Sequence, residues 1–566
     1  MRMARTTYTL HACAHAWIFL TCWWSFMARA MASHNSSLVG SGFADLRASA
    51  PSASELVRSF TAPEIVWTED GATCGSIQNA ANRLAELSQK WQAIPVDCGN
   101  ACFGCTAGET CCSSRGRCER GVCVCRGGAH GIDCSESPRR NKLRNLSAHP
   151  RPAGFRIYVY DLPGEFSIRP YALRSCRRAD TSMYSAEERF LRVLLADKRV
   201  RTTNPTEADL FYVPTFTTFG PAGNVGCDRA RLLLIQRYIA TRYTFWARCD
   251  GCDHAFFMTN DRGACGLGPA GKNSIILSHW GLLGPYAPTM TEFDKIGRQY
   301  IDTPQLLAGI NSARWCHSPH KDIVVPPFYA GIGQVQGSAD NSRRKFLLTF
   351  AGGIWGYNNR PHRGKKNLSY YSLGMRQALF MRYSQTADQR IRMIDHAVLD
   401  SIFSLSEFCL APAGGGFGIR LMKAIALNCV PLISQPYVLQ PFEDLLRYED
   451  FSVRVGHNEV ADLSDHLQQL QPFTVRMRRR LYDAHRAFSW EQNGLAYNYT
   501  VLALCLRAKE LKYGTAAHAE CTQLAAALPS QGKTRLRRFP SWLPPQLKSA
   551  IRSSIAMRSS RYRSTG

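Results

Sequence analysis

The chain has 566 residues, of which 45% are hydrophobic and 20% are charged, so it is a globular protein with room for two or three domains. Its formal net charge of +26, from 69 basic and 43 acidic residues, permits nucleic acid, anionic lipid or acidic polysaccharide as a partner. Because the sequence contains no recognisable nucleic-acid-binding module, we expect no nucleic-acid partner.

Residues 1–32 form a hydrophobic segment. Arg2 and Arg5 precede an apolar run over 16–28, which is shorter than the about 20 residues that a membrane-spanning helix needs. Ala28-Arg29-Ala30 also has the small-x-small pattern of a signal-peptide cleavage site. The residues alone leave both a membrane anchor and a cleaved signal peptide open, and either one directs the chain into the secretory pathway. Residues 33–73 begin rich in Ser and Ala and are predicted to form a stem.

Cysteine is concentrated in residues 74–136. Ten of the 22 cysteines lie between Cys74 and Cys134, which favours an oxidising compartment. A segment this small cannot bury an adequate core, so disulfides must stabilise it. Zinc is the alternative, and the lack of repeated Cys-x2-Cys pairs here disfavours it. The spacing of Cys118, Cys123, Cys125 and Cys134 resembles the second half of an EGF-like module, which implies that Cys123 pairs upstream and Cys125 pairs with Cys134.

Two α/β segments follow a basic linker at 137–154. In 155–334, each short apolar run is separated from the next by enough chain for a helix, as parallel strands require. In 345–510, a second series runs from a strand at 345–350 to helices near 460–470 and 475–488. Residues 511–566 are basic, and we predict a mostly disordered tail. The expected strands of the first segment lie at 156–160, 208–213, 254–259, 274–278 and 321–325, and its expected helices at 184–196 and 229–243.

A glycine cluster in the second segment has the character of an anion-binding turn. The expected strand 408–411 runs into Gly414, Gly415, Gly416 and Gly418, and a helix at 419–427 and a strand at 430–434 follow. This βαβ unit implies a parallel sheet, and its glycines let an anion approach the backbone and the helix N-terminus. Arg420 stands in the first helical turn, an unfavourable place for a cation unless it meets an anion. A tight turn with a surface arginine is the simpler alternative.

Residues 406–455 resemble the C-terminal signature of the exostosin-like glycosyltransferases (GT47), including plant and algal members. After the glycines and Arg420 come Cys429-Val430-Pro431 and Pro441-Phe442-Glu443, and further landmarks extend the resemblance over 155–506. The resemblance implies two Rossmann-like domains of the GT-B type, preceded by the EGF-like module. It also implies a type II Golgi membrane protein with a lumenal catalytic part. The expected reaction moves a sugar from a nucleotide diphosphate, expected to be UDP, to a glycan or glycoprotein acceptor with inversion.

The resemblance also implies a donor site. We expect Arg420 to neutralise the diphosphate, because its planar guanidinium can donate two hydrogen bonds to phosphate. By analogy, Ser406, Phe408 and the backbone from Pro412 to Gly416 would line the nucleoside pocket. No metal and no cofactor is expected. Lys423 stands where many relatives have a glutamate that can accept from ribose hydroxyls, so Glu443 is one candidate substitute. Weaker candidate cations are Arg343, Arg344, Arg360 and Arg376.

The candidate general bases lie in or directly after predicted strands of the first segment. Ligands of open α/β sheets bind at the carboxyl ends of the strands, and the segment from Asp253 to Asp261 is predicted to lie there. Asp261 is the first candidate base, His254 the second, and Asp161 the third. Cys249 and Cys252 have the spacing of a redox or zinc pair, but a structural disulfide is the better interpretation.

Two other classes of function stay open on sequence grounds. A catalytically inactive protein could use the EGF-like module and the basic surface to bind glycan or extracellular partners, and Lys423 speaks mildly for this. A lectin for acidic polysaccharide is supported only by charge. The sequence does not decide whether the chain forms a homo- or hetero-oligomer.

Overall fold

The structure is a computed structural model of the whole chain, and all the residues that it describes belong to one compact unit formed by Pro51–Ser137 and Ser147–Gly566. The predicted hydrophobic segment, the stem, Arg343 and Arg360 lie outside the described residues. The described residues are 111–119, 122–136, 154–162, 182–216, 225–265, 267–283, 316–335, 344–354, 371–396, 400–435, 437–456, 459–513, 521–526, 528, 539–543 and 545–565.

The cysteine-rich segment forms a small disulfide-linked hairpin. Strands β1 (Gly116–Glu119) and β2 (Val122–Cys125) pair antiparallel. Disulfides join Cys112 to Cys123 and Cys125 to Cys134, which confirms both predicted pairings and excludes zinc ligation by these four residues. Cys118 lies in β1, and its disulfide stays a prediction.

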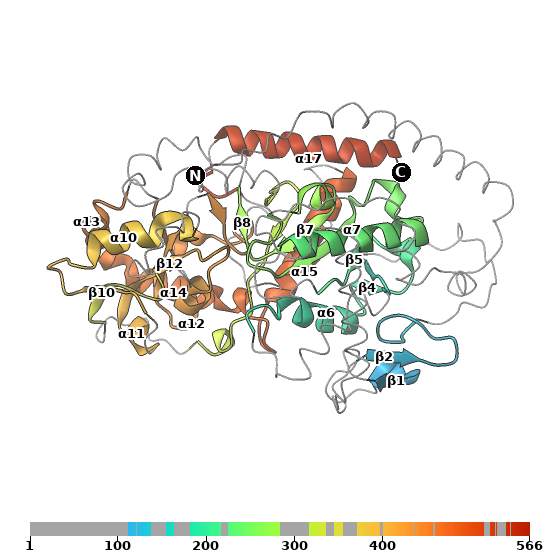
Figure 1. The fold of residues 1–566 in the computed structure, drawn as a ribbon, viewed down its shortest axis with the longest axis horizontal. Coiled ribbons are helices and arrows are strands. Elements are labelled where there is room, and N and C mark those ends of the chain that lie inside the picture. Colours follow the sequence, from blue (N-terminus) through green and yellow to red (C-terminus); the bar gives the residue numbers. More distant parts are fainter. Residues whose placement is uncertain are drawn as a thin grey trace, which may run out of the picture. The chain divides into compact units, whose positions relative to one another are not determined.

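The first α/β half contains a parallel sheet of six strands in the order β4-β3-β5-β6-β7-β9 (Figure 1). Helices α6 (Ala186–Ala196) and α7 (Val225–Arg242) cover opposite faces: residues of α6 share a core with Leu210 and Phe257, whereas residues of α7 share one with Phe211 and Phe256. The alternation arises because successive side chains of a strand point to opposite faces. The strands are β3 (Ile157–Val159), β4 (Arg201–Thr202), β5 (Leu210–Val213), β6 (His254–Met258), β7 (Ile275–Ser278) and β9 (Ile323–Val324).

The second α/β half contains a parallel sheet of five strands in the order β11-β10-β12-β13-β15. Helices α10 (Met375–Tyr383) and α13 (Leu463–Leu470) pack on one face, and α11 (Ser401–Ser404) and α12 (Arg420–Ala426) pack on the other. The strands are β10 (Phe346–Ala351), β11 (Ile391–Ile394), β12 (Ser406–Pro412), β13 (Val430–Ser434) and β15 (Val453–Arg454).

Both sheets begin with the same strand order, and it fixes where a ligand can bind. Numbered within its own half, each sheet reads 2-1-3-4-5, which is a doubly wound order, and the first sheet adds a sixth strand. In such sheets the chain reverses direction between strands 1 and 3, and ligands bind at the carboxyl ends beside that reversal. In the second half, the reversal lies between β10 and β12, so the glycine turn after β12 stands beside it. The predicted α/β class with parallel sheets is confirmed.

Several elements join the halves. Strand β8 (Gly281–Leu282) pairs antiparallel with β14 (Val438–Leu439), so one short ribbon takes a strand from each series. Helix α14 (Thr474–Ala484) remains with the second sheet, whereas α15 (Ala496–Tyr513) packs on the first. There, Lys512 of α15 donates to Asp209 at 2.7 Å, and Tyr497 donates to Asp197 at 3.1 Å. The last helix of the second series thus returns to the first half.

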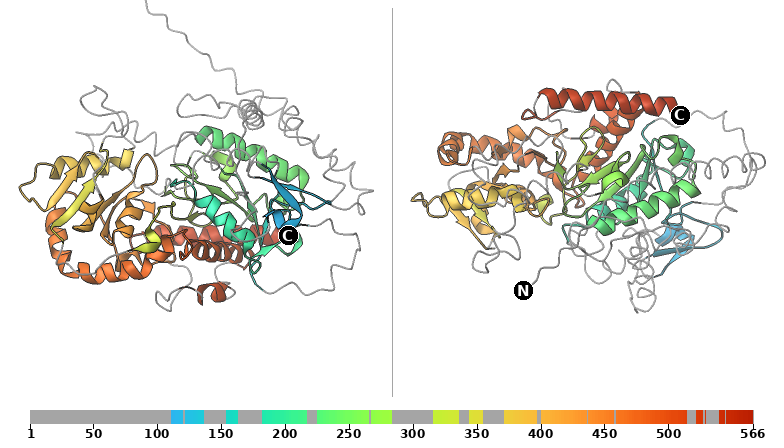
Figure 2. Two further views of the ribbon diagram at one scale, coloured as in Figure 1. Left: turned by 90° about the horizontal axis from the view of Figure 1, so that it is seen from below. Right: turned by 45° about the horizontal axis from the view of Figure 1, so that its top comes forward.

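The C-terminal segment corrects one prediction. We expected a disordered tail over 511–566, but 545–565 form α17 (Pro545–Thr565), which packs beside α15 (Figures 1 and 2). The many basic residues of this segment led to the prediction of disorder. That prediction missed the helical spacing of Leu547, Ile551 and Ile555, which pack against Leu283 and the β9–β14 region. Preceding it, Cys521 beside the short helix α16 (Thr522–Ala526) forms a disulfide with Cys505.

Within the described residues, no helix combines the length and the hydropathy that crossing a membrane requires.

Candidate donor and acid–base site

The glycine turn lies at the carboxyl end of β12, and its glycines have different tasks. A Cβ on Gly418 would overlap the carbonyl of Pro412, and one on Gly416 would overlap the carbonyl of Asp261. Gly415 faces open space, with nothing within 4 Å of such a Cβ. The N–H of Gly414 donates to the carbonyl of Gly416 at 3.0 Å, which closes the turn. Gly416 and Gly418 are therefore required by close packing, while Gly415 presents backbone to the site.

Arg420 lies between the ends of β10 and β12. It is the first residue of α12, and its guanidinium contacts the turn after β10: a Cβ on Gly352 would lie 2.5 Å from Nη2. The guanidinium also lies 5.9 Å from the ring centre of Phe350. Helix α12 has only seven residues, so the helix dipole adds little and the guanidinium is the main positive group at this point. The structure thus places Arg420 at the strand reversal.

A second arginine reaches the same turn. Arg376 of α10 donates from Nη1 to the carbonyl of Gly353 at 2.7 Å, and its guanidinium lies 5.3 Å from the ring centre of Phe350. Two guanidinium groups around one aromatic side chain give this edge of the sheet a positive potential, which favours an anionic ligand.

Asp261 meets the glycine turn from the first half. It lies three residues beyond the carboxyl end of β6, and its carbonyl accepts from the N–H of Phe417 at 2.8 Å. Arg262 extends across the same contact, with Nε 3.4 Å from the carbonyl of Gly415. Tyr184 donates from Oη to Asp261 Oδ1 at 2.6 Å. The first candidate base and the donor turn, which are far apart in the sequence, are therefore in direct contact.

The electrostatic surroundings of Asp261 favour proton exchange. Burial raises the pKa of this carboxyl above its ordinary value, and the hydrogen bond from Tyr184 and the charge of Arg262 oppose the rise. A carboxylate with a raised pKa is a stronger proton acceptor than a fully solvated one.

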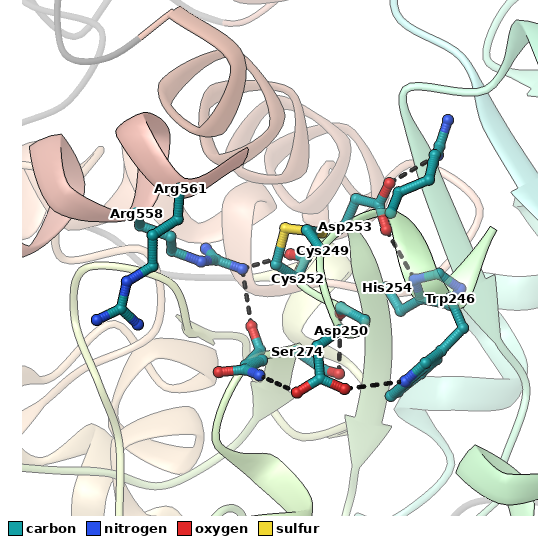
Figure 3. Close-up of a disulfide and its surroundings, with 12 residues drawn as sticks. Trp246, Cys249, Asp250, Cys252, Asp253, His254, Ser274, Arg558 and Arg561 are labelled. Carbon is teal, nitrogen blue, oxygen red and sulfur yellow. Dashed lines mark hydrogen bonds and ion pairs between the residues drawn. A yellow bond between two sulfur atoms is a disulfide. The ribbon is translucent and has the colours of Figure 1, made fainter. Parts of the chain in front are cut away.

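His254 is in the wrong place for a catalytic base. It begins β6, so it lies at the amino end of the strand, whereas Asp261 follows the carboxyl end. Its ring is fully buried, with Nδ1 2.8 Å from Asp253 and Nε2 2.9 Å from the hydroxyl of Tyr160 (Figure 3 shows the contact with Asp253). Burial lowers its pKa. The prediction is corrected for this residue: the strand register puts His254 in the core of the first half.

Asp161 lies at a different place on the carboxyl edge. It follows β3, and its Oδ2 accepts from the backbone N–H of Gly131 at 3.1 Å. This bond comes from the cysteine-rich segment, which is also anchored by Arg201: its Nη1 and Nη2 lie 2.5 and 2.9 Å from the two carboxylate oxygens of Asp133. Asp161 therefore helps to dock that segment, and the structure does not bring it to the glycine turn.

Two of the residues predicted to line a nucleoside pocket are buried away from the carboxyl edge. Ser406 begins β12 and donates to the carbonyl of Ile402 at 2.8 Å, and Phe408 lies in the core of the second half. At about 3.3 Å per residue, Ser406 lies about 20 Å from Pro412 at the far end of the strand. The prediction is therefore wrong for Ser406 and Phe408, whereas Pro412 does lie at the glycine turn. Likewise, Arg344 binds the carbonyl of Ser406 at the amino end.

Lys423 and Glu443 are engaged elsewhere. Lys423 forms an ion pair with Asp400, and its ammonium lies 4.4 Å from the ring centre of Phe403. The carboxylate of Glu443 accepts from Arg454 Nη2 at 2.7 Å and from Trp542 Nε1 at 2.7 Å. It also accepts from the backbone N–H of Gln440. Glu443 is thus saturated by protein donors, which corrects the expectation that it could bind ribose hydroxyls.

The Cys-x2-Cys pair is a disulfide, as expected. Cys249 and Cys252 are bonded to each other, and Cys265 is bonded to Cys316. Arg558 of α17 inserts beside the first of these and donates to the carbonyls of Cys252 and Asn273 (Figure 3). The loop holding this pair therefore docks the C-terminal helix.

Sequence reasoning missed Tyr184 and Phe417. Tyr184 precedes α6 and is 77 residues from Asp261, so no local pattern connects them. Phe417 stands inside the glycine cluster, and its ring packs edge-on against Tyr184 with the ring centres 5.9 Å apart. The one available signal was an aromatic residue among glycines, which is unusual where only a tight turn is needed.

The fold and this site define a sugar-transferring class of protein, and comparison with known proteins agrees. The exostosin GT47 domain matches residues 151–470, so the chain belongs to the exostosin GT47 family and is a glycosyltransferase. Among curated proteins it is 27% identical over 350 residues to the "Probable glucuronoxylan glucuronosyltransferase IRX7" of Arabidopsis thaliana, covering 57% of this chain and 69% of that protein. It is 28% identical over 342 residues to the "Probable beta-1,4-xylosyltransferase IRX10L" of the same plant, covering 58% and 75%.

Proposed function

We propose that this glycosyltransferase transfers a sugar from a UDP-linked donor to a glycan acceptor, with the two α/β halves acting as the two domains of a GT-B enzyme. The observation that carries the proposal is the contact between Asp261 and the glycine turn that precedes Arg420. Through it, a carboxylate from one half and a cation from the other serve one site. The acceptor is expected to be xylan-like or a glycoprotein glycan, since relatives are named for glucuronosyl and xylosyl transfer.

The donor diphosphate would bind at the strand reversal of the second half. Arg420 and Arg376 supply positive charge there, and the open backbone at Gly415 supplies room for a phosphate to approach. Neutralising the departing diphosphate in this way requires only protein cations, so we propose a reaction without an essential metal or cofactor.

The acceptor would be activated from the first half. Asp261 would take the proton of the acceptor hydroxyl as that oxygen bonds to the anomeric carbon, while the bond from the anomeric carbon to the UDP oxygen breaks. Because the base and the leaving group are held by opposite sides of the site, the displacement is in line and inverts the anomeric centre.

The cellular setting is proposed from the family. We propose a type II Golgi membrane protein whose described part lies in the lumen, which fits the six disulfides found in the described residues. The partners would be a nucleotide sugar, a glycan or glycoprotein acceptor and the membrane. Whether the protein forms a homo- or hetero-oligomer is a matter for measurement.

Calorimetric binding of UDP, GDP and CMP to the purified lumenal part, with and without EDTA, tests the donor site. We expect selective UDP binding that survives EDTA and weakens about 10- to 100-fold in Arg420→Ala, since an arginine–phosphate contact is a charged hydrogen bond. Arg199→Ala is the matched control, because the Arg199 side chain is 85% exposed on the surface of the first half. Folded protein that binds no nucleotide, or an Arg420→Ala variant with unchanged affinity, would contradict the proposal.

Activity with labelled xylo-oligosaccharides as acceptors, and with UDP-glucuronate or UDP-xylose as donors, tests the sugar class. Transfer from one donor and not the other would identify the donor. If the protein binds UDP but transfers no sugar to xylo-oligosaccharide, the proposed donor site is retained and the proposed xylan-like acceptor is wrong.

A further inference from the structure

Tyr184 is held at both ends of its side chain. Its hydroxyl donates to Asp261 Oδ1 at 2.6 Å, and its ring packs at 85° against the ring of Phe417. Phe417 belongs to the glycine turn, and its own N–H donates to the carbonyl of Asp261. Tyr184, Asp261 and Phe417 therefore form a closed set of contacts between the two halves.

The hydrogen bond from Tyr184 makes the two carboxylate oxygens of Asp261 unequal. Tyr184 occupies Oδ1, whereas Oδ2 accepts no hydrogen bond from any residue that the structure describes. Asp261 is half-buried. A carboxylate fixed through one oxygen presents the other in a defined direction, which is what a general base needs in order to meet one hydroxyl of a sugar.

We propose that Tyr184 is a positioning residue of the transfer reaction: it orients Asp261 through Oδ1 so that Oδ2 receives the proton of the acceptor hydroxyl. This inference rests on the proposed role of Asp261. In the step, the acceptor O–H bond breaks and its proton moves to Oδ2. The acceptor oxygen bonds to the anomeric carbon, and UDP departs with the electrons of the broken carbon–oxygen bond. Tyr184 keeps its own proton throughout.

The same contact sets the protonation of Asp261. Three influences act on this carboxyl: burial raises its pKa, the Tyr184 hydroxyl lowers it by donating to the ionised form, and the positive charge of Arg262, in the same loop, lowers it further. The backbone N–H of Phe417 binds the carbonyl of Asp261 and not its carboxylate. Loss of the hydroxyl alone removes one of the two lowering influences, so the pKa must rise.

Phe417 connects this base to the donor side. Its ring lies between Tyr184 and His279, with its centre 5.9 and 5.0 Å from theirs. His279 is itself buried, and it is fixed by a 2.9 Å contact between Nδ1 and the carbonyl of Val325. Tyr184, His279 and Asp261 of the first half thus all contact Phe417, so a shift of the glycine turn would displace Tyr184 and Asp261 together.

The test compares Tyr184→Phe with Tyr497→Phe. Both remove one hydroxyl that donates to an aspartate, because Tyr497 donates to Asp197 Oδ2 at 3.1 Å, outside the site. With UDP-glucuronate or UDP-xylose and labelled xylo-oligosaccharide, the acidic limb of kcat/KM should move up by about one pH unit in Tyr184→Phe only. The affinity for UDP should be unchanged in both variants. An unshifted limb in Tyr184→Phe would overturn the positioning role.

A second measurement does not depend on transfer. A water-soluble carbodiimide modifies protonated carboxyls. The tryptic peptide ending at Arg262 also contains Asp250 and Asp253, so tandem mass spectrometry that assigns the label to Asp261 reports the midpoint at which this residue titrates. That midpoint should rise by about one pH unit in Tyr184→Phe and stay constant in Tyr497→Phe. Equal midpoints would overturn the inference.

These readouts separate the two hypotheses. If Asp261→Asn keeps full turnover, the proposed base is wrong, whatever the labelling shows. If Asp261→Asn is inactive while Tyr184→Phe shifts neither the pH profile nor the labelling, only the role of Tyr184 is wrong. Should Tyr184→Phe fail to fold, Phe417→Leu keeps the backbone N–H and removes the ring, and a smaller shift in the same direction is expected.

Discussion

The two ends of the sheets hold similar residues for different purposes. At the amino ends, Arg248, whose side chain is 32% exposed, contacts the buried Asp253 at 2.6 Å, and Asp253 contacts the buried His254. At the carboxyl ends, Asp261 and Arg420 are half-buried and face the glycine turn. Both ends contain an arginine and a carboxylate, but only the carboxyl end combines them with open backbone.

The two ends of the sheets differ in which groups bind their charged side chains. At the amino ends, the carboxylate of Asp253 is engaged by both Arg248 and His254, so it has no capacity left for a ligand. At the carboxyl ends, the cation and the carboxylate come from different halves, and both lie beside the open backbone of the glycine turn. Position along the strand, and not residue type, separates a structural cluster from a reactive one.

The largest expected effect comes from removing the charge of Asp261. Asp261→Asn should lower turnover about 10²- to 10⁴-fold with little change in UDP affinity, because a general base acts in the chemical step. Asp253→Asn at the amino end should instead lower stability by about 1–3 kcal/mol, because it leaves the partly exposed Arg248 and the buried His254 without their carboxylate partner. Turnover, calorimetry and chemical denaturation of both variants distinguish the two ends. Equal turnover defects in two folded variants would contradict the comparison.

Acid sensitivity should arise from buried histidines near the site. Burial lowers the pKa of His279 to about 4 from an ordinary 6.5, so the unfolded chain binds the proton more readily over that range. Stability should therefore fall as the pH decreases from 6.5 to 4, by up to about 3 kcal/mol for this group. Chemical denaturation at several pH values should give a shallower dependence in His279→Asn, whose amide can still donate to Val325. An unchanged slope would show that His279 does not contribute.

Two glycines in one turn should respond unequally. Gly416→Ala should destabilise the protein by about 1–3 kcal/mol and lower turnover, because the new methyl overlaps the carbonyl of Asp261 and separates the halves. Gly415→Ala is the matched control, since nothing lies within 4 Å of the new methyl, and its stability should be nearly unchanged. Melting temperatures and UDP affinities of both variants test this. Loss of UDP binding in folded Gly415→Ala would support direct phosphate contact there.

The smallest effect is expected at Lys423. Its ion pair with Asp400 is partly exposed, since the side chain of Asp400 is 52% accessible, so Lys423→Met should change stability by less than about 1 kcal/mol. UDP affinity should stay within about two-fold, because the ammonium is engaged with Asp400 and Phe403. A large loss of UDP affinity would instead place Lys423 in the donor site.

The sequence by itself determined the local units. The period of the apolar residues and the glycine cluster predicted two parallel α/β halves and the turn before Arg420. The resemblance of the cysteine-rich segment to an EGF-like module implied the pairing of Cys125 with Cys134. These features depend on residues close together in the chain, where backbone preference and short loops leave few alternatives. The same local features did not predict α17, because the basic composition of 511–566 favours disorder, whereas the helical spacing of Leu547, Ile551 and Ile555 favours a packed helix.

Only the tertiary structure decided what each candidate meets at its end of a strand, and it moved His254 and Ser406 away from the predicted site. His254 and Asp261 are seven residues apart, yet β6 carries them to opposite ends of the sheet, and Ser406 and Pro412 are separated in the same way by β12. Asp261 contacts Tyr184 and Phe417, which lie in distant segments, and no sequence pattern in one segment predicts its contact with another. The packing of the two halves against each other fixes that contact. It depends on the burial of apolar surface and on strand register between segments far apart in the sequence, which local patterns do not encode.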